Sequence, residues 1–239
     1  MPGPFVLLHG FTQTSRAWDG VRAHLPPGRV VTPDLLGHGN DPTVSRVVFA
    51  AQLDLLDRVV PEGPLTVAGY SLGGRVALRW AVRSPERIVR LVLIGANPGI
   101  VDPDERAARR HSDDALAEAI ATDGLDAWLA RWSEQSLFAD QPAAVRAAAD
   151  ADRRRNSAAG LAAALRGFGT GIMPPVWDEL GSLTMPVICS AGERDTKYRA
   201  LSEKMAARLP RGEAVTIRDA GHAAHLEQPE AVARLISGA

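Results

Sequence analysis

The sequence has few of the features that mark secreted, membrane or metal-dependent proteins. Its 239 residues include a single cysteine, Cys189, so no internal disulfide can form. No stretch approaches the roughly 20 apolar residues of a membrane-spanning helix, and the first residues lack the basic segment of a secretory signal. The net charge is only −1, which does not favour nucleic acid or a membrane surface as a partner. We therefore expect a cytoplasmic protein that is a monomer or a weak homo-oligomer.

The sequence also gives little support for chemistry that depends on a metal or a cofactor. The chain has six histidines, but no two show the spacing of a helix-borne metal pair. We expect no metal and no cofactor. Apolar residues make up 46% of the chain and charged residues 23%, as in an ordinary globular protein. A chain of this length can bury a large core without disulfides or metals.

Short apolar runs alternate with helical patterns from the first residues onward. Helical patterns cover residues 45–59 and 73–82. Continuous apolar runs separated by helices indicate a parallel sheet that is buried on both faces. The predicted strands are residues 5–8, 29–32, 65–68, 91–94, 186–189 and 214–217.

The alternation stops in the middle of the chain. Between about Pro98 and Pro175 no strand pattern is found, while Leu125, Trp128, Leu129 and Trp132 recur at helical spacing. Within this part, residues 112–114 (Ser-Asp-Asp) predict the start of a helix. The sequence therefore predicts a core formed by residues 1–98 and 175–239, with a helical cap of residues 99–174 inserted between its two halves. Such a cap covers the strand ends, where α/β sheets bind ligands.

The most informative motif is Gly69-Tyr70-Ser71-Leu72-Gly73. It follows a predicted strand and opens a predicted helix, which is the setting of a nucleophile elbow. The flanking glycines allow a tight turn that holds the serine above the sheet. A serine hydroxyl needs an imidazole to take its proton, so an acid and a histidine should follow later strands.

Both partners are present in the expected order. Asp195 follows the strand at 186–189, and His222 follows the strand at 214–217. Glu193 competes for the role of the acid and His225 for that of the base, but position favours Asp195 and His222. The three motifs together predict an α/β-hydrolase fold with the catalytic residues Ser71, Asp195 and His222.

Backbone and arginine groups complete the predicted site. After the first strand, the backbone N–H of Phe11 can pair with that of Leu72 to form an oxyanion hole. Arg75 lies on the helix that follows the serine, and further arginines begin and end the cap. Most of these arginines fit a solvated helix face. A substrate with several carboxylates, however, needs guanidinium groups that bind it bidentately.

At this level the sequence resembles a known family. The segments GYSLGGR (69–75), GERDTK (192–197) and AGHAAHLE (220–227) look like those of the 2-succinyl-6-hydroxy-2,4-cyclohexadiene-1-carboxylate (SHCHC) synthases of menaquinone biosynthesis. So do the cap segments ARRHSD (108–113), RRRN (153–156) and GTG (169–171). The resemblance covers nearly the whole chain. One departure is Leu36, where the family usually has proline.

The resemblance implies a lyase rather than a hydrolase. The family eliminates pyruvate from 2-succinyl-5-enolpyruvyl-6-hydroxy-3-cyclohexene-1-carboxylate, beginning with abstraction of a proton next to the succinyl carbonyl. Ser71, activated by His222, would be the general base, and the oxyanion hole would stabilise an enolate. The partner is then a small polycarboxylate. The implied substrate-binding residues are Tyr70, Arg75, Arg109, Trp132, Lys197 and one cap arginine, for which Arg153 is preferred to Arg154 and Arg155.

Two other functions fit the same motifs. A carboxylesterase or a carbon–carbon bond hydrolase would use the same triad, but with an apolar rather than a cationic pocket. A non-catalytic binding protein could keep the fold to hold a small ligand. The complete triad argues against the last hypothesis, because a protein that only binds does not need all three residues.

Overall fold

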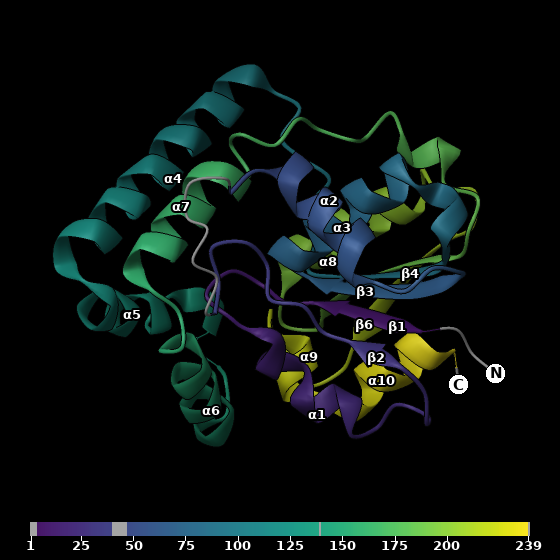
Figure 1. Cartoon of the computed structure of the whole chain (residues 1–239), viewed down its shortest axis with the longest axis horizontal. Helices are drawn as coiled ribbons and strands as arrows, with labels where there is room; N and C mark the ends of the chain where they lie inside the picture. The colour runs from purple at the N-terminus through teal and green to yellow at the C-terminus, as the bar shows by residue number, and fades with distance from the viewer. Residues whose placement is uncertain (1–3, 40–46, 139, 239) are drawn as a thin grey trace.

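A six-stranded parallel sheet forms the centre of the molecule (Figure 1). The computed structural model describes residues 4–39, 47–138 and 140–238. The strands lie in the order β2-β1-β3-β4-β5-β6, and every pairing is parallel, so all the carboxyl ends meet at one edge. Their bounds are β1 Phe5–Leu8, β2 Val30–Val31, β3 Leu65–Tyr70, β4 Ile88–Ile94, β5 Val187–Gly192 and β6 Gly212–Ile217.

Helices cover both faces of this sheet (Figure 1). On one face pack α2 (Phe49–Val59), α3 (Leu72–Arg83) and α8 (Thr196–Ala206), and on the other α1 (Asp19–Arg22), α9 (Ala224–Glu227) and α10 (Pro229–Ser237). The strands β1, β3 and β5 are buried along their whole length because both of their sides meet a helix layer. Short 3₁₀ turns lie at Ser15–Trp18, Pro85–Arg87, Ser136–Phe138 and Leu180–Ser182.

Four helices lie between β4 and β5 and stand to one side of the sheet (Figure 1). They have a small core of their own, in which Ile120, Trp128 and Leu161 are buried. The bounds of these helices, which we call the helical insertion, are α4 Pro103–Asp123, α5 Leu125–Ser133, α6 Ala143–Arg153 and α7 Ala158–Phe168. The exact limits of the predicted cap, residues 99 and 174, stay a prediction.

Buried side-chain hydrogen bonds tie the insertion to the loops beside β1 and β2. Asp152 accepts hydrogen bonds from the backbone N–H of Thr14 (2.9 Å) and from its hydroxyl. Asn156 donates to the carbonyl of Thr12 (2.7 Å) and accepts from the N–H of Gly39 (2.8 Å). These bonds fix the insertion over the carboxyl ends of the strands.

The structure confirms the predicted sheet and corrects the starts of two predicted helices. The predicted helix start at Ser112 is wrong, because Ser112 lies inside α4, which begins at Pro103. Asp102 caps this helix by accepting hydrogen bonds from the N–H groups of Asp104 (3.0 Å) and Glu105 (2.8 Å). The helix predicted at 45–59 begins at Phe49 in the structure, and Ser45 lies outside the described residues.

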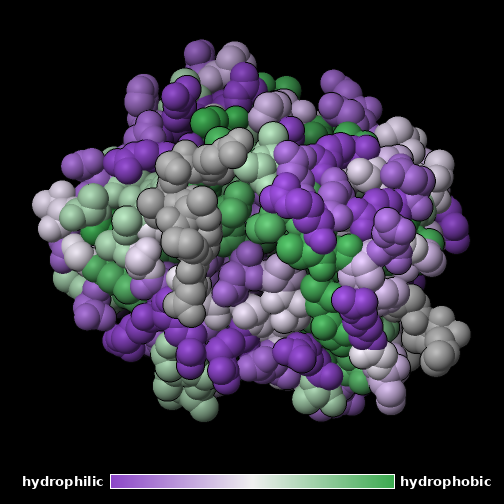
Figure 2. Space-filling model, in the orientation of Figure 1, coloured by the Kyte–Doolittle hydropathy of each residue, from purple (hydrophilic) through white to green (hydrophobic). Residues whose placement is uncertain are grey.

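Hydrophilic residues cover most of the face seen in Figure 2, and the hydrophobic residues in view form narrow bands between them. Across residues 4–39, 47–138 and 140–238, no helix is both long and apolar enough to span a bilayer.

Candidate active site

Ser71 occupies a sharp turn between β3 and α3. Its φ is 50°, a left-handed conformation that is strained for a residue with a side chain. The N–H of Ser71 donates to the carbonyl of Ile94 on β4 (2.8 Å), which holds the turn to the sheet. Two glycines make the turn possible: a Cβ at Gly73 would overlap with the carbonyl of Leu8, and one at Gly69 with the backbone of Gly73.

Asp195 and His222 meet beyond the ends of β5 and β6. His222 Nδ1 lies 2.6 Å from Asp195 Oδ2, and both residues are buried. Asp195 also caps α8 by accepting the N–H of Tyr198 at 3.3 Å, so the acid is fixed by a helix. With Nδ1 directed at the carboxylate, Nε2 is the ring nitrogen left for proton transfer with Ser71.

The loop after β1 carries the second predicted oxyanion donor. Phe11 and Leu72 both line the cavity that contains Ser71. His9 supports this loop from inside the protein: its Nε2 accepts the N–H of Leu35 (3.0 Å), so its proton is on Nδ1, which donates to the carbonyl of Gly10 (2.9 Å). Burial lowers the pKa of His9, so the ring is neutral and structural.

A cavity of about 430 Å³ lies between the sheet edge and the insertion. Ser71 and His222 both line it, on the side of the sheet. The insertion and the loop after β1 contribute an apolar wall, in which the rings of Phe11 and Trp132 lie edge to face at 5.3 Å. That wall consists of Phe11, Leu116, Trp132, Leu137, Phe138, Ala164, Leu165 and Phe168.

Three basic side chains face the same cavity. Arg75 extends from α3 and donates a hydrogen bond to the carbonyl of Phe168. Burial lowers its pKa to about 10, so it is still a cation at neutral pH. Arg109 comes from α4, and its Nε donates to Asp113 (2.8 Å), which leaves its two terminal nitrogens for a ligand. Lys197 lies at the start of α8.

The three consecutive cap arginines point in different directions. Arg153 is 2% exposed and lies behind the cavity wall, with its guanidinium 4.9 Å from the ring centre of Phe138. It donates to Asp150 (2.7 Å) and is not among the residues that line the cavity. Arg154 and Arg155 are exposed, and they lie near the exposed Asp126 and the buried Asp152 respectively. Of the three, only Arg153 is directed inward, but a side chain separates it from the cavity.

The structure also locates the remaining residues that the sequence analysis singled out. Tyr70 and Trp132 line the cavity, as the resemblance implied. Glu193 is exposed and accepts the N–H of Asp219 (3.1 Å), so it does not contact His222. His225 is buried between the rings of Trp18 and Tyr70, at 5.0 and 4.1 Å between ring centres. Burial lowers the pKa of His225 to about 3.

Among the cavity residues that sequence reasoning missed, Tyr198 and Asp113 contact predicted site residues. Tyr198 packs its ring against that of His222, 4.6 Å away, and burial raises the pKa of its hydroxyl. Asp113 is 2% exposed and accepts from Arg109 and from the N–H of Gly171 (3.3 Å), so it holds Arg109 toward the cavity. The four-residue spacing of Arg109 and Asp113 on one helix was the available signal.

Within the described ranges, no group of three or more histidine, cysteine or acidic side chains is arranged to hold a metal ion.

Comparison with known proteins gives consistent matches along the chain. Residues 5–235 match the model of the alpha/beta hydrolase family. The SHCHC synthase of Salmonella arizonae is 35% identical over an alignment of 240 positions, which covers 97% of this chain and 93% of that protein. The structure of MenH from S. aureus superposes with a TM-score of 0.92 at 32% identity, covering 99% of this chain and 92% of the other. A malate-bound esterase from Thermogutta terrifontis gives a TM-score of 0.84 at 27% identity, covering 100% of this chain and 89% of the other.

Proposed function

The chain belongs to the alpha/beta hydrolase family, and we propose that within this family it is an SHCHC synthase. Such an enzyme is a lyase that removes pyruvate from 2-succinyl-5-enolpyruvyl-6-hydroxy-3-cyclohexene-1-carboxylate. A relative of that name matches nearly its whole length. The observation that carries the proposal is the cationic lining of the cavity. Arg75, Arg109 and Lys197 face it, whereas Asp113, the one acidic residue among the described residues that line it, is already paired with Arg109.

The basic residues of the cavity suit the carboxylates of the proposed substrate better than they suit a neutral ester. The substrate has carboxylates on its ring, its succinyl group and its enolpyruvyl group. Bringing these anions into a cavity with an apolar wall is unfavourable unless cations receive them. Guanidinium groups bind carboxylates through two parallel hydrogen bonds, which also orient the ring above Ser71.

The triad supplies the base for this reaction. His222 takes the hydroxyl proton of Ser71 through Nε2, and Ser71 Oγ takes the proton next to the succinyl carbonyl. The Asp195 carboxylate at Nδ1 stabilises the imidazolium that forms. The electron pair of the broken C–H bond enters the ring, and the C–O bond to enolpyruvate breaks. The N–H groups of Phe11 and Leu72 stabilise the enolate oxygen during this step.

A carboxylesterase or a carbon–carbon bond hydrolase is the second candidate. The apolar wall formed by Phe11, Trp132 and Phe138 favours it, since this wall would suit a neutral acyl group. Such an enzyme would form an acyl-Ser71 intermediate or activate a water at the same place. The basic residues distinguish the two functions, because only the polycarboxylate lyase depends on them.

Two arginines on α3 provide a matched test. Arg75 lines the cavity, while Arg79, one turn later, donates to the carbonyl of Pro174 and does not line it. We expect Arg75→Ala to lower kcat/KM for pyruvate release by about 10- to 100-fold, chiefly through KM, since one charge-assisted contact is lost. Arg79→Ala should change it less than about threefold, as a surface substitution does. Equal effects of the two variants, or a loss of neutral-ester hydrolysis in Arg75→Ala that matches its loss of pyruvate release, would contradict the proposal.

A further inference from the structure

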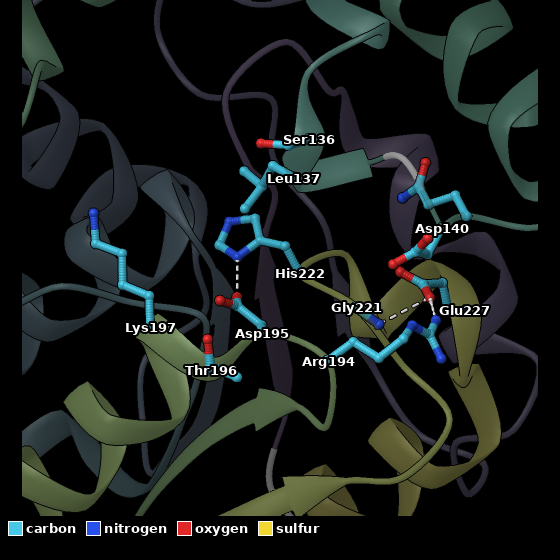
Figure 3. A pocket seen from close by; sticks show the side chains of 11 residues that line it. Ser136, Leu137, Asp140, Arg194, Asp195, Thr196, Lys197, Gly221, His222 and Glu227 are labelled. Atoms are coloured by element: carbon cyan, nitrogen blue, oxygen red, sulfur yellow. Dashed lines mark hydrogen bonds and ion pairs between the residues drawn. The ribbon is translucent and has the colours of Figure 1, made fainter.

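A second, smaller cavity of about 170 Å³ adjoins the catalytic residues (Figure 3). It is distinct from the larger cavity, but His222, Leu137 and Lys197 line both, so the two cavities meet at these residues. We call it the side pocket. Its remaining lining residues are Ser136, Asp140, Gln141, Arg194, Asp195, Thr196, Gly221 and Glu227.

The side pocket leads from the protein surface to His222. Its rim is formed by exposed residues, among them Ser136, Asp140 and Thr196. Its inner end is formed by Asp195, Gln141 and His222, which are 8%, 6% and 4% exposed. The pocket therefore brings solvent close to the His222 imidazole by a route other than the larger cavity.

Two residues that line this space, Gln141 and Glu227, carry buried polar side-chain atoms. Among the residues that the structure describes, neither the Nε2 nor the Oε1 of Gln141 has a hydrogen-bond partner, and neither has the Oε1 of Glu227. The Glu227 side chain is only 2% exposed. Buried polar atoms in proteins are rarely left without a partner, which points to a bound group that satisfies these atoms.

The other oxygen of Glu227 is already engaged. Its Oε2 accepts from Arg194 (2.6 Å) and from the N–H of Gly221 (2.9 Å), as the dashed lines in Figure 3 show. Arg194 precedes Asp195 and Gly221 precedes His222, so Glu227 connects the two loops that carry the acid and the base. This fixes the remaining oxygen, Oε1, in place as an acceptor beside the pocket.

The charges of the pocket favour a neutral bound group over an anion. The pocket is lined by the carboxylates of Asp140, Asp195 and Glu227 and by the cations Arg194 and Lys197, a balance of −1. An anion would be repelled. The free atoms include acceptors and a donor, which water satisfies, and a water occupies about 30 Å³ in the liquid, so several fit.

We propose that the side pocket holds a chain of water molecules that connects His222 with bulk solvent, and that the proton taken from the substrate exchanges with solvent through it. This inference rests on the proposed function. In that reaction His222 receives the substrate proton through Ser71, and the enolpyruvate that leaves is protonated on its methylene carbon to give pyruvate. Exchange on His222 between these two events replaces the substrate proton with one from solvent.

A high-resolution crystal structure of the protein tests the binding site without any assay. The expected result is ordered water about 3 Å from Gln141 Nε2 and from Glu227 Oε1, continued by further waters toward His222. A pocket closed by side chains, with the Gln141 amide bonded to protein groups, would overturn the inference.

Incorporation of deuterium into pyruvate measures the proton exchange between His222 and solvent. The elimination is run in D₂O with protiated substrate, and pyruvate is trapped at once by reduction to lactate and analysed by mass spectrometry. Wild-type enzyme should give product with one deuterium in the methyl group. Gln141→Leu removes both unpaired amide atoms at similar volume, and we expect an increased share of unlabelled methyl; Gln141→Met serves if that variant does not fold.

Gln228→Leu is the control, because Gln228 lines neither cavity and should give the wild-type label. Identical label in the wild type and in both Gln141 variants would overturn the inference. Absence of any pyruvate from the wild type would instead count against the proposed function, and the crystallographic test would still decide whether the pocket holds water.

Discussion

At the residue scale, backbone strain is concentrated in the loops of the candidate site. Within the described part of the chain, three residues other than glycine have positive φ: Thr12 (69°), Ser71 (50°) and Asp219 (53°). Thr12 follows the predicted oxyanion donor Phe11, and Asp219 lies three residues before His222. Strained backbone of this kind persists where the surrounding structure enforces it, and it is commonly found at functional sites.

The pH dependence of the unfolding free energy tests whether His225, unlike a catalytic histidine, is held without a proton in the folded protein. Its folded pKa is about 3, below the unfolded value of about 6.5. Between these values the unfolded chain binds a proton that the folded protein does not, so the free energy of unfolding falls as the pH falls. At pH 5 the loss from this residue is about 2 kcal/mol.

The variant His225→Phe should lack this contribution. We expect the difference in unfolding free energy between variant and wild type to change by about 2 kcal/mol in favour of the variant between pH 7.5 and pH 5. Urea unfolding at both pH values measures it. An unchanged difference would show that His225 is accessible to protons in the folded state.

The sequence predicted the triad residues because each follows directly on an apolar strand. Tyr198 and Asp113 could not be found in the same way. Tyr198 faces His222 because α8 turns it there, and Asp113 reaches Arg109 because α4 continues unbroken through Ser112. Which side of a helix faces a cavity depends on tertiary packing, which single residues do not reveal.

At the element scale, the contact between α3 and β1 positions Ser71. A Cβ at Gly73 would overlap with the backbone of Leu8 and His9, which cannot move without displacing β1 and the loop that carries Phe11. By contrast, a Cβ at Gly181 would meet nothing within 4 Å. The two glycines therefore differ in what surrounds them.

We expect Gly73→Ala to lower the free energy of unfolding by about 3 kcal/mol and to abolish most activity, because overpacking forces the backbone apart. Gly181→Ala should stay within about 0.5 kcal/mol of the wild type. Urea unfolding of both variants checks this. A Gly73→Ala protein as stable and active as Gly181→Ala would show that the elbow tolerates a side chain.

The start of α4 shows how element boundaries are misjudged. Ser112-Asp113-Asp114 has the composition of a helix start, but Asp102-Pro103 has the stronger one. An aspartate that caps two N–H groups, followed by proline in the first turn, begins the helix nine residues earlier. Ser112 is then free to line the cavity.

At the scale of the whole molecule, the site is formed by two parts of different character. The sheet supplies Ser71, Asp195 and His222, and these followed from the order of strands and motifs. The insertion supplies Arg109 and the apolar wall, and here the sequence was less informative. Arg153 illustrates why: its burial behind Phe138 depends on how α6 packs against the rest of the insertion.

The distribution of charge over the whole molecule bears on the proposed substrate. A chain of net charge −1 directs Arg75, Arg109 and Lys197 into one cavity, where a single carboxylate opposes them. Composition averages over this arrangement and could not have predicted it. The proposed substrate class follows from this local excess of positive charge.

The most direct test of the proposed function is the rate of pyruvate release from the enolpyruvyl substrate, generated in situ and followed together with diene absorbance and hydrolysis of a p-nitrophenyl ester. We predict rapid pyruvate release and slow ester hydrolysis by the wild type. Ser71→Ala and His222→Ala should each lower pyruvate release by about 10²- to 10⁴-fold, the usual contribution of a general base. Rapid ester hydrolysis without pyruvate, or near-normal kcat/KM in Ser71→Ala, would contradict the account.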